Sequence, residues 1–228
     1  MEPGFWHERW QKGEIGFHLD RFNPKLLAYW PRLAVPGNAT VFVPLCGKSL
    51  DMLWLREQGH RVVGVELSPV AVSQFFEEND ATPEVTECPP HTAYTTDGIR
   101  LYLGDYFALT PEQVWHWGEE APAHTDTAIY DRAALVALPP EMRSRYAAKM
   151  RSLSRPGTKM LLVTLEYPQA ERAGPPFSVP PDEVSAHFAD VATIEHWADD
   201  DVLPEHPHWQ ARGIAYLREH VFALTWHG

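Results

Sequence analysis

The sequence predicts an α/β fold: a mostly parallel sheet of seven strands with helices on both of its faces. One observation is a complete strand, loop, helix and strand over residues 41–66, in which two buried apolar runs flank a segment with helical apolar spacing. In a right-handed crossover, two such strands lie parallel and side by side. A second observation is that further buried or alternating runs follow at residues 99–103, 127–131 and 159–166. This pattern indicates a Rossmann-like sheet.

The remaining elements follow from local signals along the chain. Gly13 and Gly16 end a first helix that pairs aromatic residues four apart, and Ser68-Pro69 marks another helix start. Residues 80–97 are expected to form a loop with at most a short edge strand. The other expected helices cover residues 24–30, 48–58, 141–153 and 182–188, and the last two strands fall within residues 191–197 and 213–226.

Length and composition favour one domain over residues 1–228. The chain has 44% hydrophobic residues, enough for one sizeable core, and residues 1–30 are expected to form a helical lid over the cofactor and substrate site. A formal charge of −12 opposes binding to nucleic acid phosphates and to anionic membrane surfaces. No apolar run approaches the roughly 20 residues of a membrane span, and the start lacks a secretion signal. We expect a monomer in the cytoplasm that acts on a small molecule.

Metal and disulfide chemistry are not favoured. Cys46 and Cys88 are too few for a disulfide framework or a zinc site, and the apolar neighbours of Cys46 assign it to packing. His196, His206 and His208 lie close in sequence, but their spacing does not match a metal site. We therefore expect no metal.

Glu66 predicts a nucleoside ligand. A carboxylate at the tip of the second strand, about 20 residues beyond the first loop, is the usual acceptor for ribose hydroxyls. The loop over residues 44–49 lacks the three spaced glycines that let backbone approach a pyrophosphate. A ribose without pyrophosphate fits S-adenosylmethionine, so the leading hypothesis is a methyltransferase. The structural alternative is that Glu66 only caps the helix that begins near Pro69.

A phosphate-binding loop is the competing interpretation of Gly47-Lys48-Ser49. That motif needs a glycine where Phe42 stands inside the strand, so Lys48 is expected to be a solvated residue of the first helical turn. A phosphotransferase that uses Lys48 and Asp131 remains the less favoured alternative.

Other strand ends carry further candidates. Asp105 is placed to accept the adenine amino group while Tyr106 packs on the ring, although Asp105 equally suits a structural cap. Asp131 and Arg132 follow the fourth strand and are expected to face the transferred group, or else to form an ion pair with each other. The N-terminal aromatic residues either cover the sheet or hold the sulfonium by cation–π attraction.

Several segments together resemble one family: FWHERWQKGEIGFH, VPLCGKSLDM, VVGVELS, YDRAALVALPP and GPPFSVP. The chain resembles thiopurine S-methyltransferases from about Phe5 to its C-terminus. The resemblance implies a class I methyltransferase fold, S-adenosylmethionine as cofactor, and methylation of sulfur on aromatic or heterocyclic thiols, with selenium and tellurium compounds as further acceptors. It implies cofactor contacts at Trp6, Trp10, Leu45, Glu66, Asp105, Tyr106 and Arg132.

The resemblance also implies substrate residues. Phe17 matches the aromatic residue that approaches the substrate. The second arginine of the animal enzymes has no aligned counterpart, and the matching region contains His206, His208 and Arg212, of which Arg212 is taken as a substrate candidate.

Methyl transfer to a thiolate requires mainly in-line positioning. Arg132 is the catalytic candidate, because it can hold the acceptor or stabilise its anion, and no residue stands out as a base. The non-enzymatic alternative is a module that binds S-adenosylmethionine but has lost its chemistry, which would yield no S-adenosylhomocysteine with any thiol.

Overall fold

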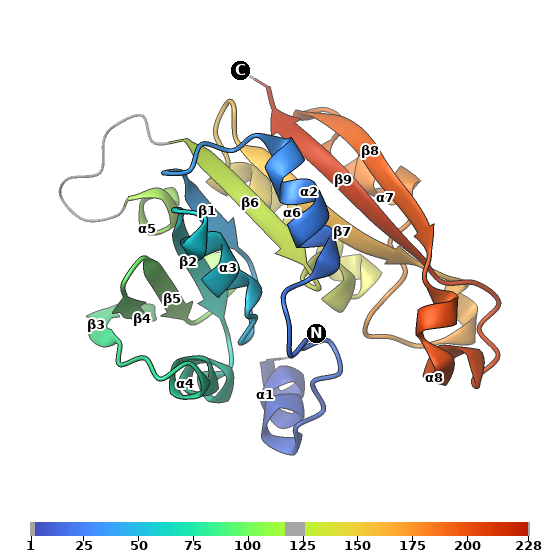
Figure 1. Ribbon diagram of the computed structural model, residues 1–228, viewed down its shortest axis with the longest axis horizontal. Coiled ribbons are helices and arrows are strands. Elements are labelled where there is room, and N and C mark those ends of the chain that lie inside the picture. Colours follow the sequence, from blue (N-terminus) through green and yellow to red (C-terminus); the bar gives the residue numbers. More distant parts are fainter. Residues whose placement is uncertain (1–2, 117–125, 228) are drawn as a thin grey trace. The chain divides into compact units, whose positions relative to one another are not determined.

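The computed structural model describes residues 3–116 and 126–227, so most of a loop expected at 118–126 lies outside the described residues. The chain divides into two compact units, Met1–Tyr130 and Asp131–Gly228. Figure 1 labels their helices and strands. The two units are described one after the other.

The first unit contains the predicted parallel strands. They are β1 (Thr40–Val43), β2 (Arg61–Glu66), β5 (Ile99–Leu103) and β6 (Thr127–Arg132), whose last two residues begin the second unit. Strand β1 pairs in parallel with β2 on one side and β6 on the other, and β2 pairs in parallel with β5. Every residue of β1 is buried, as the run of β-branched and aromatic residues predicts for a central strand.

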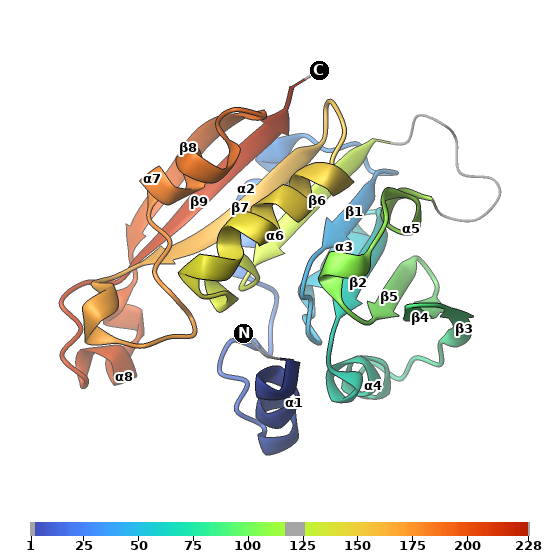
Figure 2. The same cartoon turned by 180° about the vertical axis from the view of Figure 1, so that it is seen from behind.

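The region before residue 98, expected to be a loop with at most a short edge strand, is instead a hairpin. Strands β3 (Glu84–Cys88) and β4 (His91–Thr96) are antiparallel, and β4 also pairs antiparallel with β5 (Figure 2). Four of the five residues of β3 are exposed, so this strand has no buried face to impose an apolar alternation on its sequence. The described residues therefore form nine strands: the seven expected ones and this hairpin.

Two helices of the first unit are linked to the sheet through Asp51. Asn23 caps helix α2 (Pro24–Leu33), and its own backbone N–H donates to Asp51 Oδ1 at 2.7 Å. Tyr130 of β6 donates its hydroxyl to Asp51 Oδ2 at 2.9 Å. Helix α3 (Asp51–Glu57) begins at this residue, later than the expected start at Lys48 or Ser49. The other helices are α1 (Pro3–Lys12), α4 (Pro69–Glu78), α5 (Pro111–Trp115) and the short η1 (Tyr106–Ala108).

The second unit is an antiparallel sheet with helices. Its strands are β7 (Lys159–Glu166), β8 (Ala192–Asp201) and β9 (Arg218–Trp226), with β9 paired to both of the others. Strand β8 runs four residues beyond the expected end and contains a bulge between His196 and Ala198. The helices are α6 (Pro140–Leu153), α7 (Pro181–Phe188), α8 (Pro207–Gln210) and the short η2 (Leu135–Ala137), η3 (Gln169–Glu171) and η4 (Leu203–Glu205).

Candidate active site

The loop after β1 has an unusual backbone conformation at two residues. Leu45 and Gly47 both adopt left-handed conformations, with φ of 45° and 54°. For a leucine this conformation costs free energy, and such strain persists where the surrounding structure enforces it, often at ligand sites. The backbone N–H of Cys46 donates to the carbonyl of Val65 at 3.0 Å, which holds the loop against β2.

Close packing beneath the loop explains its cysteine and a strand glycine. A Cβ on Gly64 would lie 2.5 Å from Leu101 Cδ2 and 2.7 Å from Cys46 Sγ, so only glycine fits there. Burial, and secondly the charge of Glu66, raise the pKa of the Cys46 thiol well above its ordinary value. Cys46 is thus an unreactive packing residue, as its apolar neighbours predicted.

Glu66 is a buried carboxylate that joins two loops. Its Oε2 accepts the backbone N–H of Gly47 at 2.9 Å, and its Oε1 accepts the backbone N–H of Ser68 at 2.7 Å, while only 6% of the residue is exposed. Burial raises the pKa of Glu66, and the backbone N–H groups oppose that rise. The side chain of Ser68 caps α4, so Glu66 is not the cap of that helix. A carboxylate offers about four lone-pair directions, and the backbone N–H of Leu67 also acts on this group, so some acceptor capacity remains for a ligand.

Helix α1 places aromatic rings against the same loop. The rings of Trp6 and Trp10 meet Phe17 edge-on, with centroid distances of 5.8 and 5.7 Å. A Cβ on Gly47 would lie 3.0 Å from Cζ2 of Trp10. His7 Nε2 lies 3.2 Å from the carbonyl of Leu67, just beyond the end of β2. The structure therefore brings the predicted aromatic residues to the loop that carries Leu45 and to the end of β2 that carries Glu66.

Asp105 and Tyr106 follow β5. Asp105 is exposed, and its Oδ1 accepts the backbone N–H of Phe107 at 2.9 Å as the cap of η1. Tyr106 is buried and lies parallel to Phe42 with a centroid distance of 6.3 Å. The capping alternative for Asp105 is confirmed, and its contact with adenine stays a prediction, as does that of Tyr106.

Asp131, at the end of β6, is held by hydrogen bonds inside the protein. Asp131 is fully buried in the second unit, where it accepts the Tyr146 hydroxyl at 2.7 Å and the Leu135 backbone N–H at 3.1 Å. Burial raises its pKa to about 6, against the lowering effect of the Tyr146 bond. The neighbouring Arg132 is partly buried. Asp131 therefore anchors the turn that carries Arg132.

Arg212 lies on the exposed segment after α8 in the second unit. Burial, followed by the charges of His206, Arg172 and Arg212, lowers the pKa of His208. The guanidinium of Arg172 stacks 4.2 Å from the centroid of the Trp209 ring. The segment around Arg212 is thus rich in basic groups.

Lys48 departs from its expected role. It is buried, and its Nζ lies 2.6 Å from Glu78 Oε1, so the prediction of a solvated first-turn residue is wrong. The ammonium is neutralised by a carboxylate from α4, which leaves it poorly placed to bind phosphate. This pairing weakens the phosphotransferase alternative further.

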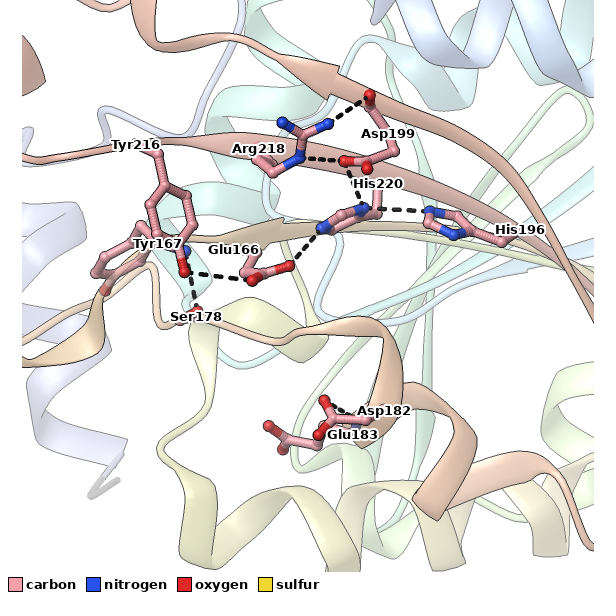
Figure 3. A network of polar contacts seen from close by, with 10 residues as sticks. All are labelled: Glu166, Tyr167, Ser178, Asp182, Glu183, His196, Asp199, Tyr216, Arg218 and His220. Atoms are coloured by element: carbon pink, nitrogen blue, oxygen red, sulfur yellow. Dashed lines mark hydrogen bonds and ion pairs between the residues drawn. The ribbon is translucent and has the colours of Figure 1, made fainter.

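Two groups of polar residues were not predicted. Asp51 is one, because no local motif reveals its distant partners Asn23 and Tyr130. The other is a network around Glu166 and His220 on β7 and β9 (Figure 3). His220 and Phe222 lie two residues apart on β9, but the strand is buried continuously from His220 to Leu224, so no alternation distinguished His220.

The described residues offer neither a metal cluster nor a helix that could span a membrane. Residues 3–116 and 126–227 contain no group of three or more His, Cys, Asp or Glu side chains that could hold a metal ion. None of the helices in these ranges has the length and apolar character of a membrane span.

Comparison with known proteins identifies relatives along the whole chain. The model of the family described as Thiopurine S-methyltransferase (TPMT) matches residues 1–227. A thiopurine S-methyltransferase of Shewanella sp. (strain W3-18-1) is 47% identical over 224 residues, which cover 98% of this chain and 99% of the relative. One from Pseudomonas fluorescens (strain SBW25) is 46% identical over 225 residues, 99% of each chain.

Solved structures share the fold at low identity. A structure that describes the conversion of a disulfide bond into a thioacetal group during echinomycin biosynthesis superposes with a TM-score of 0.62 at 18% identity, covering 99% of this chain and 93% of the other. Burkholderia thailandensis 1,6-didemethyltoxoflavin-N1-methyltransferase, solved with S-adenosylhomocysteine, gives a TM-score of 0.62 at 17% identity, with 99% and 87% coverage. These likenesses confirm the Rossmann-like class I fold.

Proposed function

Because this chain belongs to the thiopurine S-methyltransferase family, we propose that it transfers the methyl group of S-adenosylmethionine to the sulfur of aromatic or heterocyclic thiols, thiopurines among them. Selenium and tellurium compounds are further proposed acceptors. The observation that carries the proposal is the buried carboxylate of Glu66, which bridges Gly47 and Ser68 at the end of β2. A buried charge with unused acceptor positions suits the two hydroxyls of a ribose.

The residues around Glu66 fit such a cofactor. S-adenosylmethionine supplies a methyl group on a positively charged sulfur. The left-handed backbone at Leu45 and Gly47 directs the loop around a ligand, while Trp6 and Trp10 offer aromatic faces that favour a cation by about 0.5–2 kcal/mol. Asp105 and Tyr106, at the end of β5, are proposed to contact the adenine.

On the basis of the family, Phe17, Arg132 and Arg212 are each proposed as substrate residues. A guanidinium selects an anionic sulfur over a neutral one, and it also suits the cofactor's carboxylate. Arg132 is assigned to either or both of these roles. The protein's main contribution is alignment, since holding two reactants in line can supply most of the acceleration.

A product-quantified screen with isotopically labelled S-adenosylmethionine tests the proposal. Thiopurines, simple aromatic thiols, selenite and tellurite are each incubated with the enzyme, and the methylated product and S-adenosylhomocysteine are measured together. We expect equal amounts of both products with at least one aromatic thiol. Binding of S-adenosylmethionine without product from any acceptor would instead support the catalytically silent module.

Three further statements stay predictions from the sequence: a monomeric state, a cytoplasmic location and the absence of a nucleic acid partner.

A further inference from the structure

A buried histidine contacts the turn that carries Asp105 and Tyr106. His91 is the first residue of β4, and only 2% of it is exposed. Its Nε2 lies 3.0 Å from the backbone carbonyl oxygen of Asp105, and a carbonyl only accepts, so the ring donates this hydrogen bond. Both residues belong to the first unit. The imidazole thus fixes the backbone of a residue that is proposed to contact adenine.

The partner of the second ring nitrogen determines the protonation state of His91. Nδ1 lies 3.3 Å from Nε2 of Gln113 on helix α5. Thr110 sets the orientation of the Gln113 amide, because its backbone N–H donates to Oε1 at 3.0 Å in the capping box of α5. The amino group of Gln113 therefore faces Nδ1 and donates to it. These partners assign a neutral ring that carries its proton on Nε2.

Gly104 allows the ring to approach the turn. In the antiparallel pairing of β4 with β5, Thr92 lies opposite Leu103, so His91 comes next to Gly104. A Cβ on Gly104 would lie 2.4 Å from Cδ2 of His91. Any other residue at this position would push the imidazole away from the carbonyl that it binds.

The same turn is bound to the end of β2. The backbone N–H of Gly104 donates to the carbonyl of Glu66 at 2.9 Å, which continues the parallel pairing of β2 with β5 past Leu103. The carboxylate proposed to bind ribose and the carboxylate of Asp105 therefore follow adjacent strands. A nucleoside that binds both needs the turn of Asp105 to be held in a fixed position relative to Glu66.

We propose that His91 is a positioning residue for adenine recognition: its Nε2 donor fixes the backbone of Asp105, so that the Asp105 carboxylate meets the amino group of the purine. The inference rests on the proposed function, and in particular on the adenine contact proposed for Asp105. That carboxylate also caps η1 through the Phe107 N–H at 2.9 Å. Because a carboxylate offers about four lone-pair directions, capping and adenine binding are compatible.

The expected effect is on ligand discrimination rather than on affinity in general. The probe is the deamino analogue of S-adenosylhomocysteine, which has hydrogen in place of the adenine amino group and keeps the ribose and the amino acid. A hydrogen bond to a charged group changes an equilibrium constant by about tenfold or more, and Asp105 is exposed. We therefore expect wild type to prefer S-adenosylhomocysteine over the analogue by about tenfold.

Calorimetric titration of both ligands tests the proposal with wild type, His91→Leu and His91→Gln. Leucine fills a similar space without a donor, whereas glutamine places an amino group near the position of Nε2 and can keep the hydrogen bond. For His91→Leu, we expect the dissociation constant of S-adenosylhomocysteine to rise by about fivefold to tenfold, and that of the analogue to stay within about threefold of wild type. His91→Gln should keep most of the preference.

The ring tautomer provides a second readout. Nuclear magnetic resonance of the ring nitrogens, with the His91 signals identified by their absence from His91→Gln, should show a neutral ring protonated on Nε2. Gln113→Glu keeps an oxygen for Thr110 and presents another oxygen to Nδ1. It should convert His91 to the doubly protonated form, which still donates to Asp105, and so preserve the ligand preference. A wild-type ring protonated only on Nδ1 would overturn the proposal, because Nε2 could not donate.

Controls separate positioning from a purely structural role. His116→Leu, the same exchange at an exposed histidine that ends α5, should leave the preference unchanged. Thermal melting shows whether each variant folds, and if His91→Leu does not, the tautomer and Gln113→Glu still decide. A folded His91→Leu protein with the wild-type preference, or with equal losses for both ligands, would overturn the proposal.

The wild-type protein distinguishes failure of the inference from failure of the function. Binding of neither ligand would count against the proposed function. Equal binding of both ligands, together with methyl transfer to a thiol, would contradict the adenine contact of Asp105 and with it the role of His91, while the proposed function would stand.

Discussion

Replacing Glu66 by glutamine is expected to weaken both the cofactor site and the loop beneath it. The carboxylate accepts two buried backbone N–H groups, from Gly47 at 2.9 Å and Ser68 at 2.7 Å. A glutamine of the same shape has one acceptor oxygen and one amino group, so one of these N–H donors would face another donor. A hydrogen bond to a charged group is worth about 1.5–3 kcal/mol, and we expect the free energy of unfolding to fall by about that amount.

The same substitution should reduce cofactor affinity. Ribose hydroxyls that donate to a carboxylate would donate to a neutral amide, with a loss of about 1–3 kcal/mol. The dissociation constant of S-adenosylhomocysteine should therefore rise by about 5- to 150-fold, as measured by calorimetry. Unfolding in urea measures the change in the free energy of unfolding separately. Glu77→Gln, which changes an exposed residue of α4, is the matched control. A folded Glu66→Gln protein with the wild-type dissociation constant would refute the assignment of Glu66 to the ribose.

Three further predictions concern the lid and the end of β6. Deleting residues 1–17 should abolish turnover but leave the far-ultraviolet circular dichroism of the sheet, since α1 supplies Trp10 over the loop; wild-type turnover would show that the segment is ordinary covering. Arg132→Lys should lower turnover more than melting temperature, because lysine keeps the charge but loses the planar fork; normal kinetics with a lowered melting temperature would make Arg132 structural. The pKa of Asp131 rises on folding from 3.8 to about 6, so the folded state favours the protonated acid, and its stabilising effect is lost as the pH rises through that window. Asp131→Asn should remove this decline in denaturation curves measured between about pH 4 and about pH 6, and an unchanged slope would contradict it.

The parallel strands could be predicted because buried strands have mainly apolar sequences. The runs of β1, β2 and β5 are short, apolar and bounded by loop residues, and Glu66 follows from its position at a strand end. The hairpin β3–β4 could not be predicted, because the exposed strand β3 has no apolar alternation. Helix α3 also starts late, and its first residue is the buried Asp51.

Some site residues could be predicted from local sequence patterns, whereas others depend on partners far away in the sequence. Strand position indicated Glu66, and helical spacing placed Trp6 and Trp10 on one face, which the structure brings to Gly47 and Phe17. The burial of Lys48 could not be predicted, because its partner Glu78 is 30 residues away in the sequence. The contact between Glu166 and His220 joins residues 54 apart and depends on the pairing of β7 with β9, which no local pattern specifies.

Cofactor binding at Glu66 underlies the proposed function, and a crystal structure of the complex with S-adenosylhomocysteine tests this binding most directly. We expect both ribose hydroxyls to donate to Glu66, with the ligand against the loop of Leu45 and Gly47 and beneath Trp10. A ligand bound elsewhere, with Glu66 still accepting only the backbone N–H groups of Gly47 and Ser68, would contradict the central claim.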